Sequence, residues 1–186
     1  MMEDKQMAAE ASIQYIKDGM TVGLGSGSTV NFMLEKLAER IKEGLTIKGI
    51  PSSLKTERFA KQLGIPLTDF SNTTKIDIAI DGADEVDPNL HLLKGGGGSL
   101  VREKIVDQAA DRLIIIVDSS KTVSKLGDSP LPVEVLSFGF EVTTEQIAAF
   151  GCTPVLRKRD GQPFVSDNGN YIVDCKFASI EDPQAL

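Results

Sequence analysis

Thr21-Val-Gly-Leu-Gly-Ser-Gly-Ser-Thr29 joins a short apolar strand to a helix, and the fold class follows from it and its surroundings. Thr21–Leu24 is typical of a strand, and residues 30–43 then return to helical periodicity. Glycine lets the connecting backbone turn tightly and approach a ligand closely. The N–H groups at the start of a helix, beside serine and threonine hydroxyls, can form an anion site. Ser26–Thr29 is therefore a candidate phosphate-binding loop.

This loop also has an explanation without function, as a tight turn in which Ser28 or Thr29 caps the helix. Two nucleotide-binding motifs do not fit it. The dinucleotide fingerprint requires glycine where Ser28 stands, and the nucleoside-triphosphate loop requires a lysine that this loop lacks. A small phosphorylated ligand fits better than either nucleotide, while the capped turn stays open.

Strands and helices alternate along the chain on both sides of the loop. Helices are expected over residues 3–17, from Ser52 or Ser53 to Leu63, and over 100–110; strands are expected at 45–50, 65–70, 76–80 and 113–117. The last of these is an unbroken apolar run, typical of a strand buried on both faces of a parallel sheet. The alternation predicts an α/β fold with a Rossmann-like parallel-sheet domain.

The pattern changes near residues 127–132, which are predicted to be a linker. A helix is expected at 143–150, and Asp160-Gly161 and Asn168-Gly169 are turn signals between short apolar runs. We therefore expect two domains, residues 1–128 and a small α+β domain at residues 129–186. Asp182-Pro183 begins a helix pattern that only three residues follow, so a C-terminal truncation is also expected.

Composition restricts the function classes. A formal net charge of −7 argues against broad, non-specific nucleic-acid binding, which depends on basic surface. Cys152, Cys175 and His91 have no metal-ligand spacing, so no metal site is expected and the thiols are expected to be free and buried. The polar N-terminus has no signal-peptide pattern and no apolar run is long enough to cross a bilayer, so we expect a cytoplasmic protein without membrane or nucleic-acid partners.

Asp81-Gly-Ala-Asp-Glu-Val-Asp87 lies at the carboxyl end of an expected strand, where open α/β sheets bind their ligands. Asp81 and Asp84 are candidates for acid–base chemistry or for binding hydroxyls. Glu85 and Asp87 are expected to be exposed and solvated, because neighbouring carboxylates repel each other. A calcium loop is unsuitable because its third position is Ala83.

Lys94-Gly-Gly-Gly-Gly-Ser-Leu-Val-Arg-Glu-Lys104 contains four consecutive glycines, whose ordering costs conformational entropy. The favoured use of this bare backbone is donation of N–H groups to a ligand oxyanion; a flexible linker is the alternative. If Ser99 caps the following helix, the capping-box position is Arg102, so Glu103 is not explained as a cap partner. It is a functional candidate, with an ordinary exposed helix residue as the alternative. The same two possibilities apply to Lys121.

These three blocks together resemble the signature blocks of the ribose-5-phosphate isomerase A family. The stretches at 118–121, 131–135 and 166–170 are similar to that family too, in the same order along the chain. The resemblance implies an enzyme that interconverts D-ribose 5-phosphate and D-ribulose 5-phosphate without a cofactor, as a homodimer. Family members continue beyond the Glu-Asp-Pro segment with the rest of a helix and further strands, which this chain lacks.

The resemblance also implies roles for individual residues. Glu103 would be the base that moves a proton between C1 and C2 through a cis-enediolate. Asp81, Asp84 and Lys94 would assist ring opening and bind the sugar hydroxyls and enediolate oxygens. The remaining substrate-binding residues would be Ser26, Gly27, Ser28, Thr29, Gly82, Ala83, Gly95, Gly96, Gly97 and Lys121.

Two other functions stay open. A non-catalytic phosphosugar-binding module would keep the loops and bind ligand without turnover. A coenzyme A transferase would use a glutamate that forms a thioester, beside a wide nucleotide cleft; the short chain and the phosphosugar-type blocks disfavour it. A dehydrogenase is disfavoured by the missing dinucleotide fingerprint.

Overall fold

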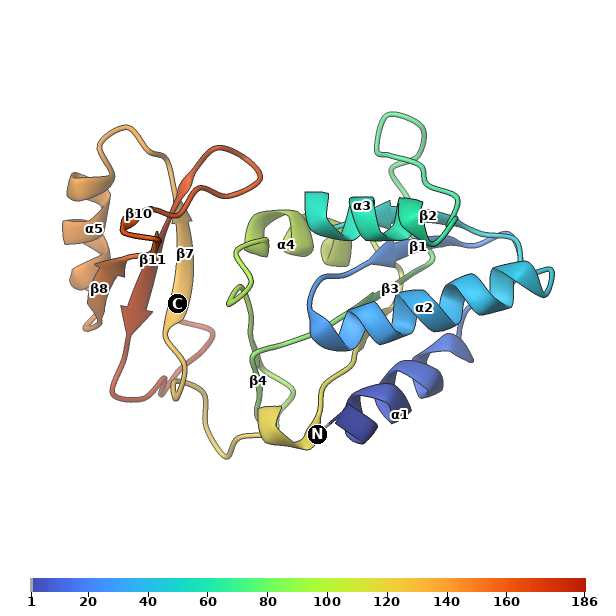
Figure 1. The fold of residues 1–186 in the computed structure, drawn as a ribbon. Coiled ribbons are helices and arrows are strands. Elements are labelled where there is room, and N and C mark those ends of the chain that lie inside the picture. Colours follow the sequence, from blue (N-terminus) through green and yellow to red (C-terminus); the bar gives the residue numbers. More distant parts are fainter. Residues whose placement is uncertain (1) are drawn as a thin grey trace. The chain divides into compact units, whose positions relative to one another are not determined.

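The computed structural model describes residues 2–186 and has a mixed α/β fold with one parallel sheet and small antiparallel sheets (Figure 1). The chain forms two compact units. The first contains the chain up to Gly82 and Val101–Ser120; the second contains Ala83–Leu100 and Lys121–Leu186. The expected division into domains at residues 1–128 and 129–186 remains a prediction. In the described part of the chain no helix is both long and apolar enough to span a membrane.

The first unit contains the parallel sheet that the alternating pattern predicted. Its strands are β1 (Thr21–Leu24), β2 (Lys48–Pro51), β3 (Ile78–Asp81) and β6 (Leu113–Ile115), in the order β2-β1-β3-β6. All three pairings are parallel, and Leu24 lies opposite Pro51 on one side and Ile80 on the other. The carboxyl ends of β1 and β3 therefore lie together, and the glycine loop and Asp81 follow from them directly.

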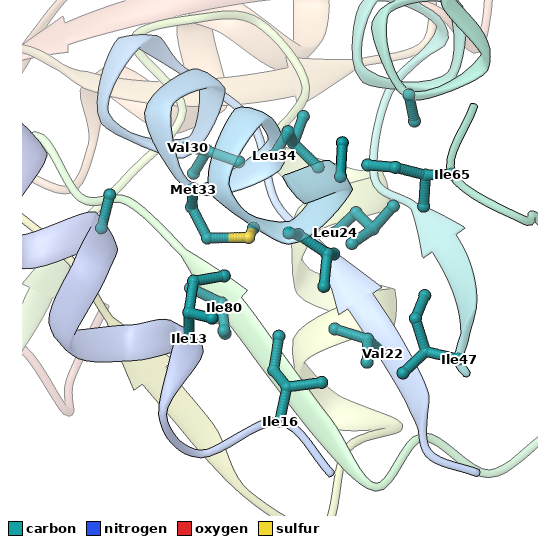
Figure 2. Close-up of a cluster of buried hydrophobic side chains, with 14 of the residues drawn as sticks. Ile13, Ile16, Val22, Leu24, Val30, Met33, Leu34, Ile47, Ile65 and Ile80 are labelled. Carbon is teal, nitrogen blue, oxygen red and sulfur yellow. The ribbon is translucent and has the colours of Figure 1, made fainter. Parts of the chain in front are cut away.

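Helices cover both faces of this sheet. Side chains of α1 (Met2–Ile13), α2 (Ser28–Lys42) and α3 (Leu54–Gln62) share one core with β1 and β3. Figure 2 shows Leu24 and Ile80 of the sheet beside Val30, Met33 and Leu34 of α2. The opposite face packs on α4 (Leu100–Gln108) through Ala79 and Val106. Because side chains alternate along a strand, neighbouring residues of β3 enter different cores.

Two local expectations in this unit are wrong, and so is one of the alternatives left open. Residues 65–70 form no strand; only Leu67 makes a single bridge, to Gly49. The apolar run at 113–117 is not buried on both faces: it forms the edge strand β6, in which Leu113 is 39% exposed and Ile114 and Ile115 are half-buried. The N-cap of α2 is Gly27, without a side-chain cap, rather than Ser28 or Thr29. In α3, by contrast, the expected Ser53 cap is present: its hydroxyl accepts from the N–H of Thr56 at 3.0 Å.

The second unit is built on a three-stranded antiparallel sheet. Its order is β7-β11-β8, from β7 (Leu131–Val135), β11 (Tyr171–Lys176) and β8 (Thr153–Leu156). The helix α5 (Phe140–Ala148), which starts three residues before its expected beginning, lies beside this sheet (Figure 1). Its Phe140 and Ile147 pack against the core of this unit. Cys152 and Cys175 are free and buried in the same core.

Short hairpins complete the second unit. β9 (Lys158–Arg159) and β10 (Gln162–Pro163) are antiparallel, joined by Asp160-Gly161 as the turn signal predicted. β4 (Glu85–Val86) and β5 (Leu92–Leu93) pair in the same way. Residues 127–132 are not a simple linker, since Gly127 is buried and β7 begins at Leu131. Asp182-Pro183 begins a turn rather than a helix.

Candidate functional site

Asp81 organises the glycine loop of the first unit. It is the last residue of β3, and its side chain is fully buried. Its Oδ1 accepts the N–H of Ser26 at 2.9 Å and that of Gly82 at 2.7 Å. A Cβ at position 25 would lie only 2.2 Å from this oxygen. Glycine is required at position 25 because the Asp81 carboxylate occupies the space that any side chain would need.

The hydroxyl of Ser26 is held by a cluster that sequence reasoning did not find. It lies 2.9 Å from the hydroxyls of Ser52 and Ser53 and 3.2 Å from that of Thr56. Thr56 in turn donates to the carbonyl of Gly25 at 2.8 Å. These partners precede or begin α3, so the loop is fastened to two elements at once. Only the two serines had been singled out from the sequence, and then as helix caps.

Positive charge reaches the start of α2 from α1. Lys5 donates from Nζ to the hydroxyl of Ser28 at 2.9 Å, and the same Nζ lies 3.7 Å from the carboxylate of Asp118. Gly27 and Ser28 are exposed, whereas Thr29 is buried. An ammonium group and a helix N-terminus both favour an anion at this place. Lys5 was missed because a lysine in a polar helix turn carries no sequence signal of function, although the structure half-buries it.

Glu103 is placed by α4. It lies in the first turn of the helix, and its side chain is only 5% exposed, so the exposed-residue alternative is wrong. On the same helix Val106 packs against the sheet, where it would contact any Cβ at Gly23. A carboxylate in this position is shielded from bulk water and lies near the positive end of a helix dipole.

The second unit carries the four-glycine run and Asp84. The Oδ2 of Asp84 accepts the N–H of Gly96 at 2.7 Å. The carbonyls of Gly95 and Gly96 accept from Arg157, which sequence reasoning also missed. Gly98 has a φ of 87° and would bring a Cβ within 2.5 Å of the Phe164 ring, so this position requires glycine. The run is thus an ordered loop rather than a flexible linker.

Glu85 and Asp87 correct a further expectation, because both are buried rather than solvated. Burial opposes the ionisation of Glu85, but its bonds from the N–H groups of Gly127 and Ser129 outweigh this and lower the pKa. Burial likewise opposes ionisation of Asp87, while the His91 ring, 2.9 Å away, and the N–H groups of His91 and Asn89 lower its pKa. The backbone donors of the folded chain make these buried carboxylates possible.

The predicted site residues are divided between the two units. The first holds Ser26, Gly27, Ser28, Thr29, Asp81, Gly82 and Glu103; the second holds Ala83, Asp84, Lys94, Gly95, Gly96, Gly97 and Lys121. Hydrogen bonds join Ser26, Asp81 and Gly82 in the first and Asp84 and Gly96 in the second. Lys121 is half-buried at the end of the short helix η1 (Ser119–Lys121). Within residues 2–186 no three His, Cys, Asp or Glu side chains form a group that could hold a metal ion.

A family model, curated relatives and solved structures that are at least 35% identical to this chain point to one family. Residues 48–186 match the family model described as ribose 5-phosphate isomerase A (phosphoriboisomerase A). A curated ribose-5-phosphate isomerase A of Oceanobacillus iheyensis is 54% identical over 184 residues, covering 98% of this chain and 82% of the relative. The solved ribose 5-phosphate isomerase of Plasmodium falciparum is 45% identical with a TM-score of 0.94, covering 98% of this chain and 82% of that one.

A further solved structure carries a ligand. It is a D-ribose-5-phosphate isomerase in complex with phospho-erythronic acid, 38% identical with a TM-score of 0.94 over 98% of this chain and 82% of that one. The similarity therefore extends over both units of the present chain.

Proposed function

Because the chain belongs to the ribose 5-phosphate isomerase A family, we propose that it interconverts D-ribose 5-phosphate and D-ribulose 5-phosphate, a step of the pentose phosphate pathway. One observation supports this most directly: Glu103 is a buried carboxylate in the first turn of α4. Enolisation requires one positioned base and donors for the oxyanion that develops. The oxidation of C2 is matched by the reduction of C1 within the same molecule, so the reaction needs no external electron acceptor.

Glu103 acts as the base in this proposal. It removes the proton from C2 of the open-chain aldose, and the electron pair moves to form a cis-enediolate. The proton of the C2 hydroxyl passes to O1, and Glu103 returns the abstracted proton to C1 as the C2 carbonyl forms, which yields the ketose. A base that is only 5% exposed retains the proton between the two steps better than one exchanging freely with water.

Asp81, Asp84 and Lys94 assist ring opening and bind the sugar hydroxyls and enediolate oxygens. Asp81 is fully buried and anchored through Oδ1 to two backbone N–H groups, which suits a positioned hydroxyl acceptor better than a mobile acid. Gly82, Ala83 and the N–H groups of the glycine run contribute contacts from the backbone. Lys94 supplies a positive charge beside developing negative charge.

The loop Ser26–Thr29 binds the phosphate. Exposed backbone at Gly27 and Ser28, the N-terminus of α2 and the ammonium of Lys5 support this assignment. Lys121 provides a second cation for the substrate. A phosphate with two negative charges is strongly hydrated in water. To bind it, the site must supply positive charge and donors that replace those interactions with water.

We further propose that the enzyme acts as a homodimer, as the family resemblance implies, and in the cytoplasm, as the sequence led us to expect. Its substrate is an ionised phosphate ester, for which a bilayer is a high barrier. Light scattering of the purified chain measures the oligomeric state, and cell fractionation measures the location.

The direct test is formation of ribulose 5-phosphate from ribose 5-phosphate by the purified chain. Glu103→Gln is nearly isosteric and removes the base, so turnover should fall by at least ~10²-fold while substrate binding persists. Glu141→Gln, on an exposed helix turn, is the matched control and should leave turnover unchanged. Undiminished turnover in Glu103→Gln would exclude Glu103 as the base. Binding without any turnover in the folded wild-type chain would favour the phosphosugar-binding module.

A further inference from the structure

We infer that Arg157 is a positioning residue that orients and polarises the Gly96–Gly97 peptide, so that the N–H of Gly97 is a strong donor to an anionic substrate oxygen. This inference rests on the proposed function, because it assigns a purpose to one part of the same site. All the residues that carry it belong to the second unit.

The glycine run needs external anchors to hold one conformation. Four consecutive glycines have no side chains of their own and lose much conformational entropy when they are ordered. The Gly95–Gly96 peptide is held at both ends: its N–H donates to Asp84 at 2.7 Å, and its carbonyl accepts the N–H of Gly98 at 3.0 Å and Nη1 of Arg157 at 3.3 Å. Both hydrogen-bonding groups of this peptide are therefore occupied by other residues of the protein.

The next peptide is held at one end only. The carbonyl of Gly96 accepts from Nη1 of Arg157 at 3.0 Å. In a trans peptide the carbonyl and the following N–H point in opposite directions, so the N–H of Gly97 points away from Arg157. This N–H has no acceptor among the residues that the structure describes, and Gly97 is exposed with no neighbouring atom around its missing side chain. It is thus available to a ligand.

Arg157 itself is fixed by Asp174. Nε donates to one carboxylate oxygen at 2.9 Å, and Nη2 donates to the other. This bidentate pair holds the plane of the guanidinium, which leaves Nη1 directed at the two glycine carbonyls. Arg157 precedes β9, and Asp174 lies on β11, so the sheet of the second unit sets the position of the glycine run.

The charge of Arg157 adds an electronic effect to this geometry. A cation that donates to a carbonyl draws electron density from the peptide, which strengthens the N–H of the same peptide as a donor. Such a donor gains most when a full negative charge develops on its acceptor, as on an enediolate oxygen. Arg157 should consequently influence the transition state more than the bound sugar phosphate.

The experiment compares Arg157→Gln with Arg159→Gln. Arg159 is the matched control because it lies two residues away and stacks on the Phe164 ring at 4.6 Å, without any bond to the glycine run. We expect kcat to fall ~10- to 100-fold in Arg157→Gln, with the KM for ribose 5-phosphate changed less than ~3-fold. Arg157→Lys should recover only part of kcat, because one ammonium cannot hold both Asp174 and the carbonyls. Arg159→Gln should match the wild type.

Ligand binding supplies a second readout. Phospho-erythronic acid carries a planar carboxylate that stands in for the enediolate oxygens, and inorganic phosphate probes only the phosphate end. In Arg157→Gln the affinity for phospho-erythronic acid should fall in proportion to kcat, while that for phosphate stays constant. Unchanged kcat and unchanged phospho-erythronic acid affinity, in a variant that melts like the wild type, would overturn the inference. Equal losses for both ligands would also overturn it, since they indicate general damage to the site.

Two precautions keep the test decisive. If Arg157→Gln does not fold, Asp174→Asn replaces it: this change keeps Arg157 but weakens its orientation, and it should lower kcat in the same direction by a smaller factor. If the wild-type chain shows no turnover, the proposed function fails, and the inference is then judged by phospho-erythronic acid binding. Weaker binding in Arg157→Gln than in both the wild type and Arg159→Gln supports it, and equal affinities in all variants contradict it.

Discussion

Gly25 and Asp81 interlock: the Asp81 carboxylate lies where a side chain at position 25 would begin, with Oδ1 only 2.2 Å from the Cβ position. The same oxygen accepts the N–H groups of Ser26 and Gly82. The loop at the end of β1 and the residue that ends β3 thus hold each other in place.

This relationship predicts that Gly25→Ala displaces Asp81 and greatly reduces isomerase activity. Overpacking at a buried site costs about 1–3 kcal/mol, so the free energy of unfolding should also fall. Gly64→Ala is the control, since it introduces strain at a φ of 76° after α3 but has open space around its Cβ. Steady-state kinetics and urea unfolding of both variants check the prediction. It would be contradicted if kcat fell equally in the two.

Lys5→Gln should weaken phosphate binding at the start of α2. Loss of a charged hydrogen bond near an anion typically costs ~1.5–3 kcal/mol, so KM should rise roughly 10- to 100-fold with a smaller change in kcat. Inorganic phosphate should inhibit the variant less effectively than the wild type. Lys36→Gln, which breaks only exposed ion pairs with Glu10 and Glu39, should leave both constants unchanged. An unaltered KM in Lys5→Gln would exclude Lys5 from phosphate binding.

Glu85 should make the second unit sensitive to acid. Its pKa is lowered in the folded chain, so its stabilising effect is present above the unfolded value near 4.5 and is lost as the pH falls through the folded value. Glu85→Gln should therefore reduce the free energy of unfolding at pH 7 by about 1–3 kcal/mol, and the difference from the wild type should narrow below pH 4.5. Urea unfolding between pH 7 and pH 3 measures this. Glu181→Gln, which removes an exposed pair with Lys125, serves as the control. A difference independent of pH would show that the charge of Glu85 is not involved.

The thiol of Cys175 should be unreactive in the folded protein. Burial, reinforced by the neighbouring Cys152, raises the pKa of Cys175 to about 12, and only the thiolate is a good nucleophile. Titration with a disulfide reagent at pH 8 should modify Cys175 only after a denaturant is added, as mass spectrometry of the labelled peptide can show. Rapid labelling of Cys175 in the native chain would contradict this prediction.

Much of the first unit could be predicted because its signals are local. Apolar runs of strand length, helical periodicity and glycine at each connection lie within short stretches, and β1, α2 and β3 appear where the pattern placed them. The glycine-rich blocks were recognisable for the same reason. The expected strand at 65–70 failed because an apolar, strand-like segment also needs an available neighbouring strand, and only one bridge forms there.

Charged residues were harder to place. Glu85 and Asp87 stand in an acidic stretch and were expected in solvent, yet both are buried. The donors for Glu85 are backbone N–H groups more than forty residues away, at Gly127 and Ser129. No local sequence pattern can indicate that a distant backbone N–H will bind this carboxylate, because every residue except proline carries the same N–H group.

The sequence by itself determined the alternation that produces a parallel sheet, and it placed Ser26–Thr29 and Asp81 directly after strands of that sheet. Only the tertiary structure decided that Lys5 meets Ser28, that Asp81 fills the space over Gly25 and that Arg157 holds the glycine run. The physical reason is the range of the forces involved. Secondary-structure propensity and the periodicity of hydrophobic residues depend on neighbours close in the sequence. The hydrogen bonds of these side chains depend instead on how distant segments pack together.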